Sequence, residues 1–91
     1  MLQNQIALIT GTSRGIGKAI AIKLGMDGAT VIGTATTDEG AKSISHYLNE
    51  AGIKGKGIVL NVNDTDQIKN IFTEIRKEFG EITILVNNAG I

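Results

Sequence analysis

The chain of 91 residues contains no cysteine, no proline and no tryptophan, and its formal net charge is zero. Without cysteine it forms no disulfide and offers no thiolate, which fits a reducing compartment such as the cytoplasm. Balanced charge gives no reason to expect nucleic acid or a membrane surface as a partner. No signal peptide or membrane-spanning run is visible. The hydrophobic content of 42% indicates a globular chain, and the length fits one domain at most.

Short apolar runs alternate with longer segments of helical periodicity. The runs predict strands at residues 6–9, 30–35, 57–60 and 82–86. Apolar stripes at 16–24, 41–51 and 68–79 predict helices between them, the third capped by Asn63 or Asp64. The first helix is apolar round most of its circumference, so we expect it to be buried nearly all round.

The predicted order of elements is βαβαβαβ. Such alternation implies a parallel sheet with right-handed crossovers and helices on both faces, in three α/β/α layers. The expected strand order is 3-2-1-4, the first part of a doubly wound sheet that binds nucleotides. A fourth strand at the edge leaves apolar backbone unpaired, which native proteins avoid. We therefore expect residues 1–91 to be an incomplete, amino-terminal dinucleotide-binding portion of a larger domain.

A glycine-rich stretch, TGTSRGIGKAIA at residues 10–21, joins the first strand to the first helix. A P-loop requires four residues between its glycines and a hydroxyl after the lysine. Here five residues separate Gly11 from Gly17, and Ala19 follows Lys18. A P-loop is therefore not predicted.

The three glycines of this turn suit a dinucleotide instead. Gly11 lets the chain turn sharply off the strand, Gly15 lets backbone approach a pyrophosphate, and Gly17 lets the helix pack closely on the sheet. The N–H groups of the first helical turn then point at the anion, and Thr12 and Ser13 add hydroxyl donors. The pattern predicts a phosphate-binding turn, although similar turns also serve as plain connections.

The end of the second strand indicates which dinucleotide is bound. NAD sites usually place an acid there to accept a hydrogen bond from the ribose 2′-hydroxyl. Residues 34–37 read TATT, and the first acid is Asp38. Hydroxyls do not repel a 2′-phosphate, and Arg14 supplies a fixed cation with several donors. NADPH is therefore the predicted cofactor.

Two motifs carry a family resemblance. TGTSRGIG at 10–17 and NNAG at 87–90 resemble the short-chain dehydrogenase/reductase family, whose fold is of the Rossmann type. The stretches VIGTATTDEGAKSI, LNVND and EFGEITILVNNAGI are similar to the bacterial 3-oxoacyl-(acyl-carrier-protein) reductases. The resemblance covers the whole chain, although members of that family are much longer.

The resemblance also implies a role for individual residues. Asn61 stands where the wider family often carries an acid, and its amide can still bond to the adenine edge. Asn87 is expected to serve the backbone scaffold. The implied cofactor-binding residues are Gly11, Thr12, Ser13, Arg14 and the Ile16 N–H for the phosphates, Thr36 for the adenosine ribose, Asn61 and Val62 for adenine, and Asn88, Ala89 and Gly90 for the nicotinamide-side ribose.

No catalytic residue and no metal site is predicted within the chain. His46 has no partner cluster and is expected to face solvent. Tyr47 lacks the lysine four residues later that the family's catalytic tyrosine has, since residue 51 is Ala51; packing against the sheet is expected. Asp38 and Glu39 suit the start of a helix. We therefore expect residues 1–91 alone to be inactive.

The resemblance implies an NADPH-dependent reduction of 3-oxoacyl thioesters, carried on acyl carrier protein, in fatty-acid synthesis. It also implies a homo-oligomer, commonly a tetramer. Two alternatives stay open from the residues. One is another short-chain dehydrogenase/reductase with a different carbonyl or alcohol substrate. The other is a non-catalytic dinucleotide-binding module.

Overall fold

The computed structural model describes residues 2–13, 15–61 and 63–88. The elements in chain order are β1 (Ile6–Ile9), α1 (Gly15–Met26), β2 (Thr30–Ala35), α2 (Asp38–Glu50), β3 (Gly55–Val59), α3 (Thr65–Glu78) and β4 (Ile84–Val86). The four strands are parallel and lie in the order β3-β2-β1-β4. The predicted alternation and strand order are confirmed. Strand β3 begins two residues earlier than predicted, and β4 begins two residues later.

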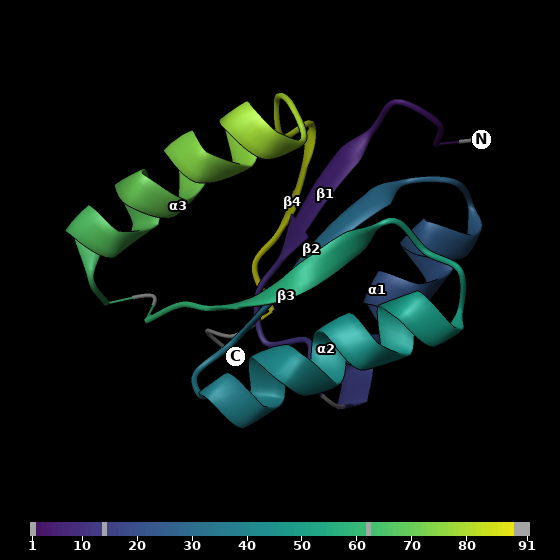
Figure 1. Cartoon of the computed structure of the whole chain (residues 1–91), viewed down its shortest axis with the longest axis horizontal. Coiled ribbons are helices and arrows are strands. Elements are labelled where there is room, and N and C mark those ends of the chain that lie inside the picture. The colour runs from purple at the N-terminus through teal and green to yellow at the C-terminus, as the bar shows by residue number, and fades with distance from the viewer. Residues whose placement is uncertain (1, 14, 62, 89–91) are drawn as a thin grey trace.

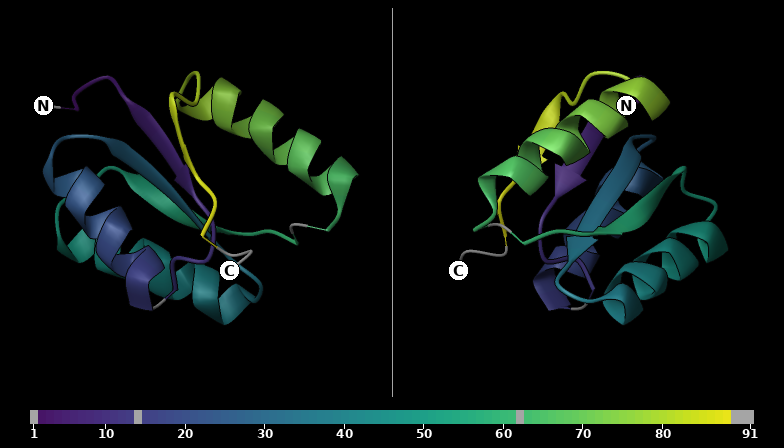
Figure 2. Two further views of the ribbon diagram at one scale, coloured as in Figure 1. Left: turned by 180° about the vertical axis from the view of Figure 1, so that it is seen from behind. Right: turned by 60° about the vertical axis from the view of Figure 1, so that its left-hand side comes forward.

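The sheet forms the middle of three layers. Helices α1 and α2 lie on one face and α3 lies on the other, as Figures 1 and 2 show from three directions. Successive side chains of β1 point to opposite faces. Ala7 and Ile9 join the core under α1 and α2, whereas Ile6 and Leu8 join the core under α3. Strand β1 is therefore buried on both sides, as its continuous apolar run predicts.

Capping side chains fix where two of the helices begin. The Thr37 hydroxyl accepts the N–H of Gly40 at the start of α2 (3.0 Å). The Asp64 carboxylate accepts the N–H of Gln67 at the start of α3 (3.1 Å), so Asp64, one of the two predicted candidates, is the cap. Each cap satisfies an N–H that has no partner within its helix. Both helices thus start just beyond the carboxyl ends of β2 and β3.

Helix α1 differs from its prediction. Its buried residues are Gly17 and Ala21, whereas the side chains of Ile16 and Met26 are 74% and 67% exposed. One side of the helix faces the sheet and α2, and no other described element covers its outer side. An all-round apolar pattern shows which residues tolerate burial, but a helix is buried only where another element packs on it.

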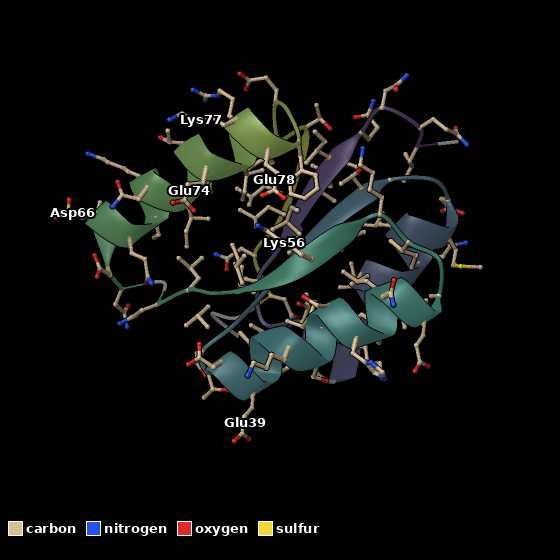
Figure 3. All side chains as sticks on the ribbon, in the orientation of Figure 1. Glu39, Lys56, Asp66, Glu74, Lys77 and Glu78 are labelled. Atoms are coloured by element: carbon tan, nitrogen blue, oxygen red, sulfur yellow. The ribbon has the colours of Figure 1, made fainter. Side chains whose placement is uncertain are left out.

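An ion pair links β3 to α3 across the sheet edge. Lys56 Nζ lies 2.7 Å from Glu78 Oε1, and both side chains are labelled in Figure 3. The ammonium also lies 5.9 Å from the ring centroid of Phe79. Because both side chains reach solvent, the pair adds at most about 1 kcal/mol to stability.

Candidate cofactor-binding site

A pocket of about 220 Å³ opens at the carboxyl ends of β1, β2 and β3. It brings together four of the predicted binding residues, Gly11, Ser13, Thr36 and Asn61. Thr34, Ala35, Leu60 and Asn63 complete the lining, so none of the lining residues is charged. A second pocket of about 280 Å³, between α3 and β4, contains none of the predicted residues. The site therefore lies where open α/β sheets place their ligands.

The glycine turn has the backbone conformation that its spacing predicts. Gly11 and Gly15 have φ values of 68° and 65°, a region that costs other residues energy. A Cβ atom added at Gly15 would meet no heavy atom within 4 Å, so the space beside this residue is open. A Cβ atom at Gly17 would collide with the carbonyl oxygen of Gly11 and lie 2.7 Å from the Asn88 amide nitrogen. Gly17 thus allows α1 to begin directly against the turn.

Strand β2 anchors the first half of the turn through Thr34. The Gly11 N–H donates to the Thr34 hydroxyl (3.3 Å), and the Thr12 N–H donates to the Thr34 carbonyl (3.0 Å). The Thr12 hydroxyl donates to the same carbonyl (3.4 Å), and Thr12 is completely buried. In this structure the Thr12 hydroxyl faces the protein interior rather than the pocket, so its predicted contact with a phosphate stays a prediction. Thr12 holds the turn to the sheet.

The end of β4 anchors the other side of the turn. The Asn88 N–H donates to the Thr10 hydroxyl (2.9 Å), and the Asn88 amide donates to the Gly11 carbonyl (3.1 Å). The Thr10 hydroxyl donates in turn to Asn87 Oδ1 (3.2 Å). Asn87 therefore serves the scaffold, as predicted. Asn88 also bonds to the scaffold, through the Thr10 hydroxyl and the Gly11 carbonyl, and its amide lies beside the glycine turn.

Tyr47 supports the glycine turn from outside the pocket, a role that the sequence did not reveal. It packs against the core of the α1 and α2 face, as predicted, but its hydroxyl also donates to the Thr12 carbonyl (2.6 Å). Lys18 Nζ lies 5.1 Å from the ring centroid. Burial raises the pKa of the Tyr47 phenol above its ordinary value, against the opposing effect of the bond to Thr12, so the group stays a donor at neutral pH. Tyr47 follows buried Ile44 by three residues in the same helix, and this spacing was the sequence signal that its ring faces the interior.

Asn61 and Thr36 stand at the mouth of the pocket. Thr36 is exposed just after β2. The Asn61 Oδ1 accepts the N–H of Asn63 (2.9 Å), and the Asn61 N–H donates to Gln67 Oε1 (2.7 Å). This local turn uses the acceptor of the Asn61 amide and leaves its NH₂ group exposed to solvent. Asn61 can therefore offer donors at the rim.

The remaining predicted residues divide into two groups. Ile16 lies in the first turn of α1, where backbone N–H groups have no partner within the helix. Arg14, Val62, Ala89 and Gly90 lie outside the described residues.

His46 and Glu39, two of the residues set aside as non-catalytic, lie on the surface. His46 is exposed and lies 2.7 Å from Glu50 Oε1 along α2, which confirms its predicted solvent-facing position. Glu39 extends outward from the start of α2 (Figure 3). Within the described ranges, no group of three or more metal-ligating side chains comes together. No described helix is long and apolar enough to span a membrane.

Comparison with known proteins places this geometry in a family. The model of the short chain dehydrogenases matches residues 5–91. The chain belongs to the short-chain dehydrogenase family. The glycine turn and the four strands in the order 3-2-1-4 lie within the matched residues.

Several curated family members are similar over nearly the whole chain. The 3-oxoacyl-(acyl-carrier-protein) reductase FabG of Haemophilus influenzae is 57% identical over 90 residues, which cover 99% of this chain and 36% of that protein. FabG of Salmonella typhimurium is 58% identical over 89 residues, 98% of this chain and 35% of its own length. FabG of Pseudomonas aeruginosa is 48% identical over 90 residues, with coverage of 99% and 36%. The chain therefore spans about a third of the length of these relatives.

Proposed function

We propose that residues 1–91 form the cofactor-binding part of an NADPH-dependent 3-oxoacyl-(acyl-carrier-protein) reductase. One observation carries the proposal: an anchored glycine turn opens into an uncharged pocket at the carboxyl edge of the sheet. The chain is also 57% identical to a reductase of that name. In this proposal the protein acts in the cytoplasm as a homo-oligomer, and its substrate is a 3-oxoacyl thioester on acyl carrier protein.

The described residues fit the adenosine and pyrophosphate end of the cofactor. The open space beside Gly15 admits a phosphate, and the first turn of α1 offers N–H donors to it. The uncharged lining at Thr36 tolerates a 2′-phosphate, which an acid would repel. Donors from Asn61 suit the acceptor nitrogens of adenine.

Other residues complete the proposed site. Gly11, Ser13, Arg14 and the Ile16 N–H bind the phosphates, while Thr12 acts only through the turn that it anchors. Val62 flanks adenine beside Asn61, and Asn88, Ala89 and Gly90 line the nicotinamide-side ribose.

The chain's part in the reaction is to bind and orient. When bound, the nicotinamide supplies a hydride to the ketone. The developing alkoxide needs an acid, and neither His46 nor Tyr47 lies at the pocket: His46 pairs with Glu50 on the exposed side of α2, and the Tyr47 hydroxyl is bound to Thr12. The acid is therefore proposed to come from outside residues 1–91.

The test is a binding and turnover assay on the complete gene product. Fluorescence titration should give tighter binding of NADPH than of NADH, and nicotinamide absorbance should fall when a 3-oxoacyl thioester is added. Arg14→Ala should weaken NADPH binding by about 1.5–3 kcal/mol, the scale of a hydrogen bond to a charged group. Arg76→Ala is the matched control, because Arg76 is exposed on α3 and pairs with Glu81.

Each outcome bears on a separate part of the proposal. Equal affinity for NADH, or an unchanged Arg14→Ala variant, would contradict the choice of NADPH. Turnover of other carbonyls only would favour a different family activity. Cofactor binding with no turnover of any carbonyl would favour a non-catalytic module.

A further inference from the structure

We propose that Tyr47 is a positioning residue for the phosphate-binding turn: it holds the Thr12 carbonyl so that the adjoining Ser13 N–H is presented to the cofactor. This inference rests on the proposed function, since it assigns Tyr47 to the binding of a dinucleotide phosphate. Tyr47 does not touch the ligand itself.

The contact joins two distant parts of the chain at the turn. Tyr47 lies in the second half of α2, 35 residues from Thr12 in sequence, and its hydroxyl is 2.6 Å from the Thr12 carbonyl oxygen. The ring packs against the buried core of that face, which restricts where the hydroxyl can reach. A tyrosine has few rotatable bonds, so a packed ring delivers its hydroxyl to a defined place at a low entropic cost.

Backbone planarity passes this contact on to the site. The Thr12 carbonyl and the Ser13 N–H belong to one trans peptide unit, so they point in opposite directions. Holding the carbonyl toward α2 therefore directs the Ser13 N–H away from α2. Ser13 lines the pocket, and no hydrogen bond from its N–H to another described residue is found. The Ser13 N–H is therefore a donor fixed in direction and available to an anion.

Thr12 is held from both sides. Its N–H and its hydroxyl are bound to Thr34 of β2, and its carbonyl is bound to Tyr47 of α2. Without the Tyr47 hydroxyl the Thr12–Ser13 peptide keeps its anchor on the sheet but loses the contact that fixes its plane. The bond to Tyr47 therefore controls the orientation of a donor, while the bonds to Thr34 control its position.

The same helix supplies a matched control. The Ser45 hydroxyl accepts the N–H of Gly57 in β3 (2.9 Å), another hydrogen bond between an α2 side chain and strand backbone. Ser45 is absent from the lining of the cofactor pocket. Ser45→Ala and Tyr47→Phe each remove one hydroxyl from α2, so a difference between them in cofactor binding reports on the turn rather than on the helix.

The experiment measures NADPH dissociation constants, kcat and urea midpoints for the complete gene product and both variants. We expect Tyr47→Phe to weaken NADPH binding about five- to tenfold, the scale of one hydrogen bond. We expect kcat at saturating NADPH to stay within twofold. Ser45→Ala should leave NADPH affinity within twofold of the wild type. It should lower the urea midpoint about as much as Tyr47→Phe does.

Hydrogen exchange of the wild-type protein provides a second measurement that needs no variant. Bound NADPH should slow exchange of the amides in residues 11–13, because the Ser13 N–H then has an acceptor. Unchanged exchange, NADPH affinity of Tyr47→Phe within twofold of wild type, or an equal loss in Ser45→Ala would each overturn the role of Tyr47. A wild-type protein that binds neither NADPH nor NADH would overturn the proposed function together with this inference.

Discussion

The two faces of the sheet are buried to different depths. Among the described residues, eight core residues are buried under α1 and α2, including Val31, Ile44 and Leu48 with no exposed surface. In the same part of the chain, four core residues are buried under α3, and Ile75 is the one among them that comes from the helix. The two aromatic rings there, Phe72 and Phe79, are half-buried. Both faces are covered by amphipathic helices, so amphipathicity does not explain the difference.

Two structural features explain the difference in burial between the two faces. Two helices lie side by side on the first face, whereas α3 lies alone among the described elements on the second (Figure 2). Glycines also let α2 and the glycine turn approach closely: a Cβ at Gly57 would collide with the Ala41 carbonyl of α2. A Cβ at Gly33 would lie 2.9 Å from Ile44 Cγ2 of α2 and would collide with the Thr12 hydroxyl of the turn. The glycine turn is therefore built on the more tightly packed face.

The largest expected effect contrasts one core residue from each face. Leu48→Ala should lower the free energy of unfolding of the 91-residue chain by about 3–4 kcal/mol, because Leu48 is fully buried. Phe72→Ala should cost about 1–2 kcal/mol despite the larger side chain, because less of the ring leaves water on folding. Urea unfolding followed by circular dichroism measures both losses. A larger loss of stability for Phe72→Ala than for Leu48→Ala would contradict the difference in burial between the two faces.

A second prediction concerns the close approach at the turn. Gly33→Ala should cost about 1–3 kcal/mol through overpacking, because the added methyl group meets the Thr12 hydroxyl. It should also weaken NADPH binding to the complete gene product, since relief of that clash moves the turn. Thermal melting with and without NADPH separates the two effects. A loss of stability with unchanged cofactor affinity would show that the turn tolerates movement of Thr12.

The smallest effect is a pH dependence on the packed face. The folded-state pKa of Tyr47 is raised by burial, so its contribution to stability is complete below about pH 10 and is lost as the pH rises through the folded value. Between pH 8 and pH 11 the wild type should lose slightly more stability than Tyr47→Phe, by less than about 1 kcal/mol. The two proteins share every other ionisable group, so the difference between their curves isolates the phenol. Parallel curves would contradict the assignment.

The sequence predicts local structure well where a single physical property of a residue type determines the local conformation. Gly11 and Gly15 adopt the positive φ values that the turn requires, and Asp64 caps α3. The apolar runs also predict the strand order, because few topologies satisfy a βαβ alternation. These features depend on neighbours in the sequence or on general rules of chain connection.

The features that escaped prediction depend on contacts between distant residues. The inward direction of Thr12 follows from Thr34, 22 residues away, and the role of Tyr47 follows from how deeply α2 packs. The outer side of α1 is exposed because no other described element packs on it. Residue type alone shows that Thr12 and Tyr47 can donate hydrogen bonds, but it does not show to which atoms.

The anchoring of the turn by Asn88 has a consequence for the order of folding. Asn88 is 77 residues from Gly11 in the chain, yet its amide bonds to the Gly11 carbonyl, and β4 pairs directly with β1. Contacts of such separation form late, because a long loop must close before they stabilise anything. During synthesis Gly11 is made before Asn88, which follows it 77 residues later in the chain. We therefore expect the glycine turn, although it is made before its anchor, to be among the last parts of these residues to reach its final shape.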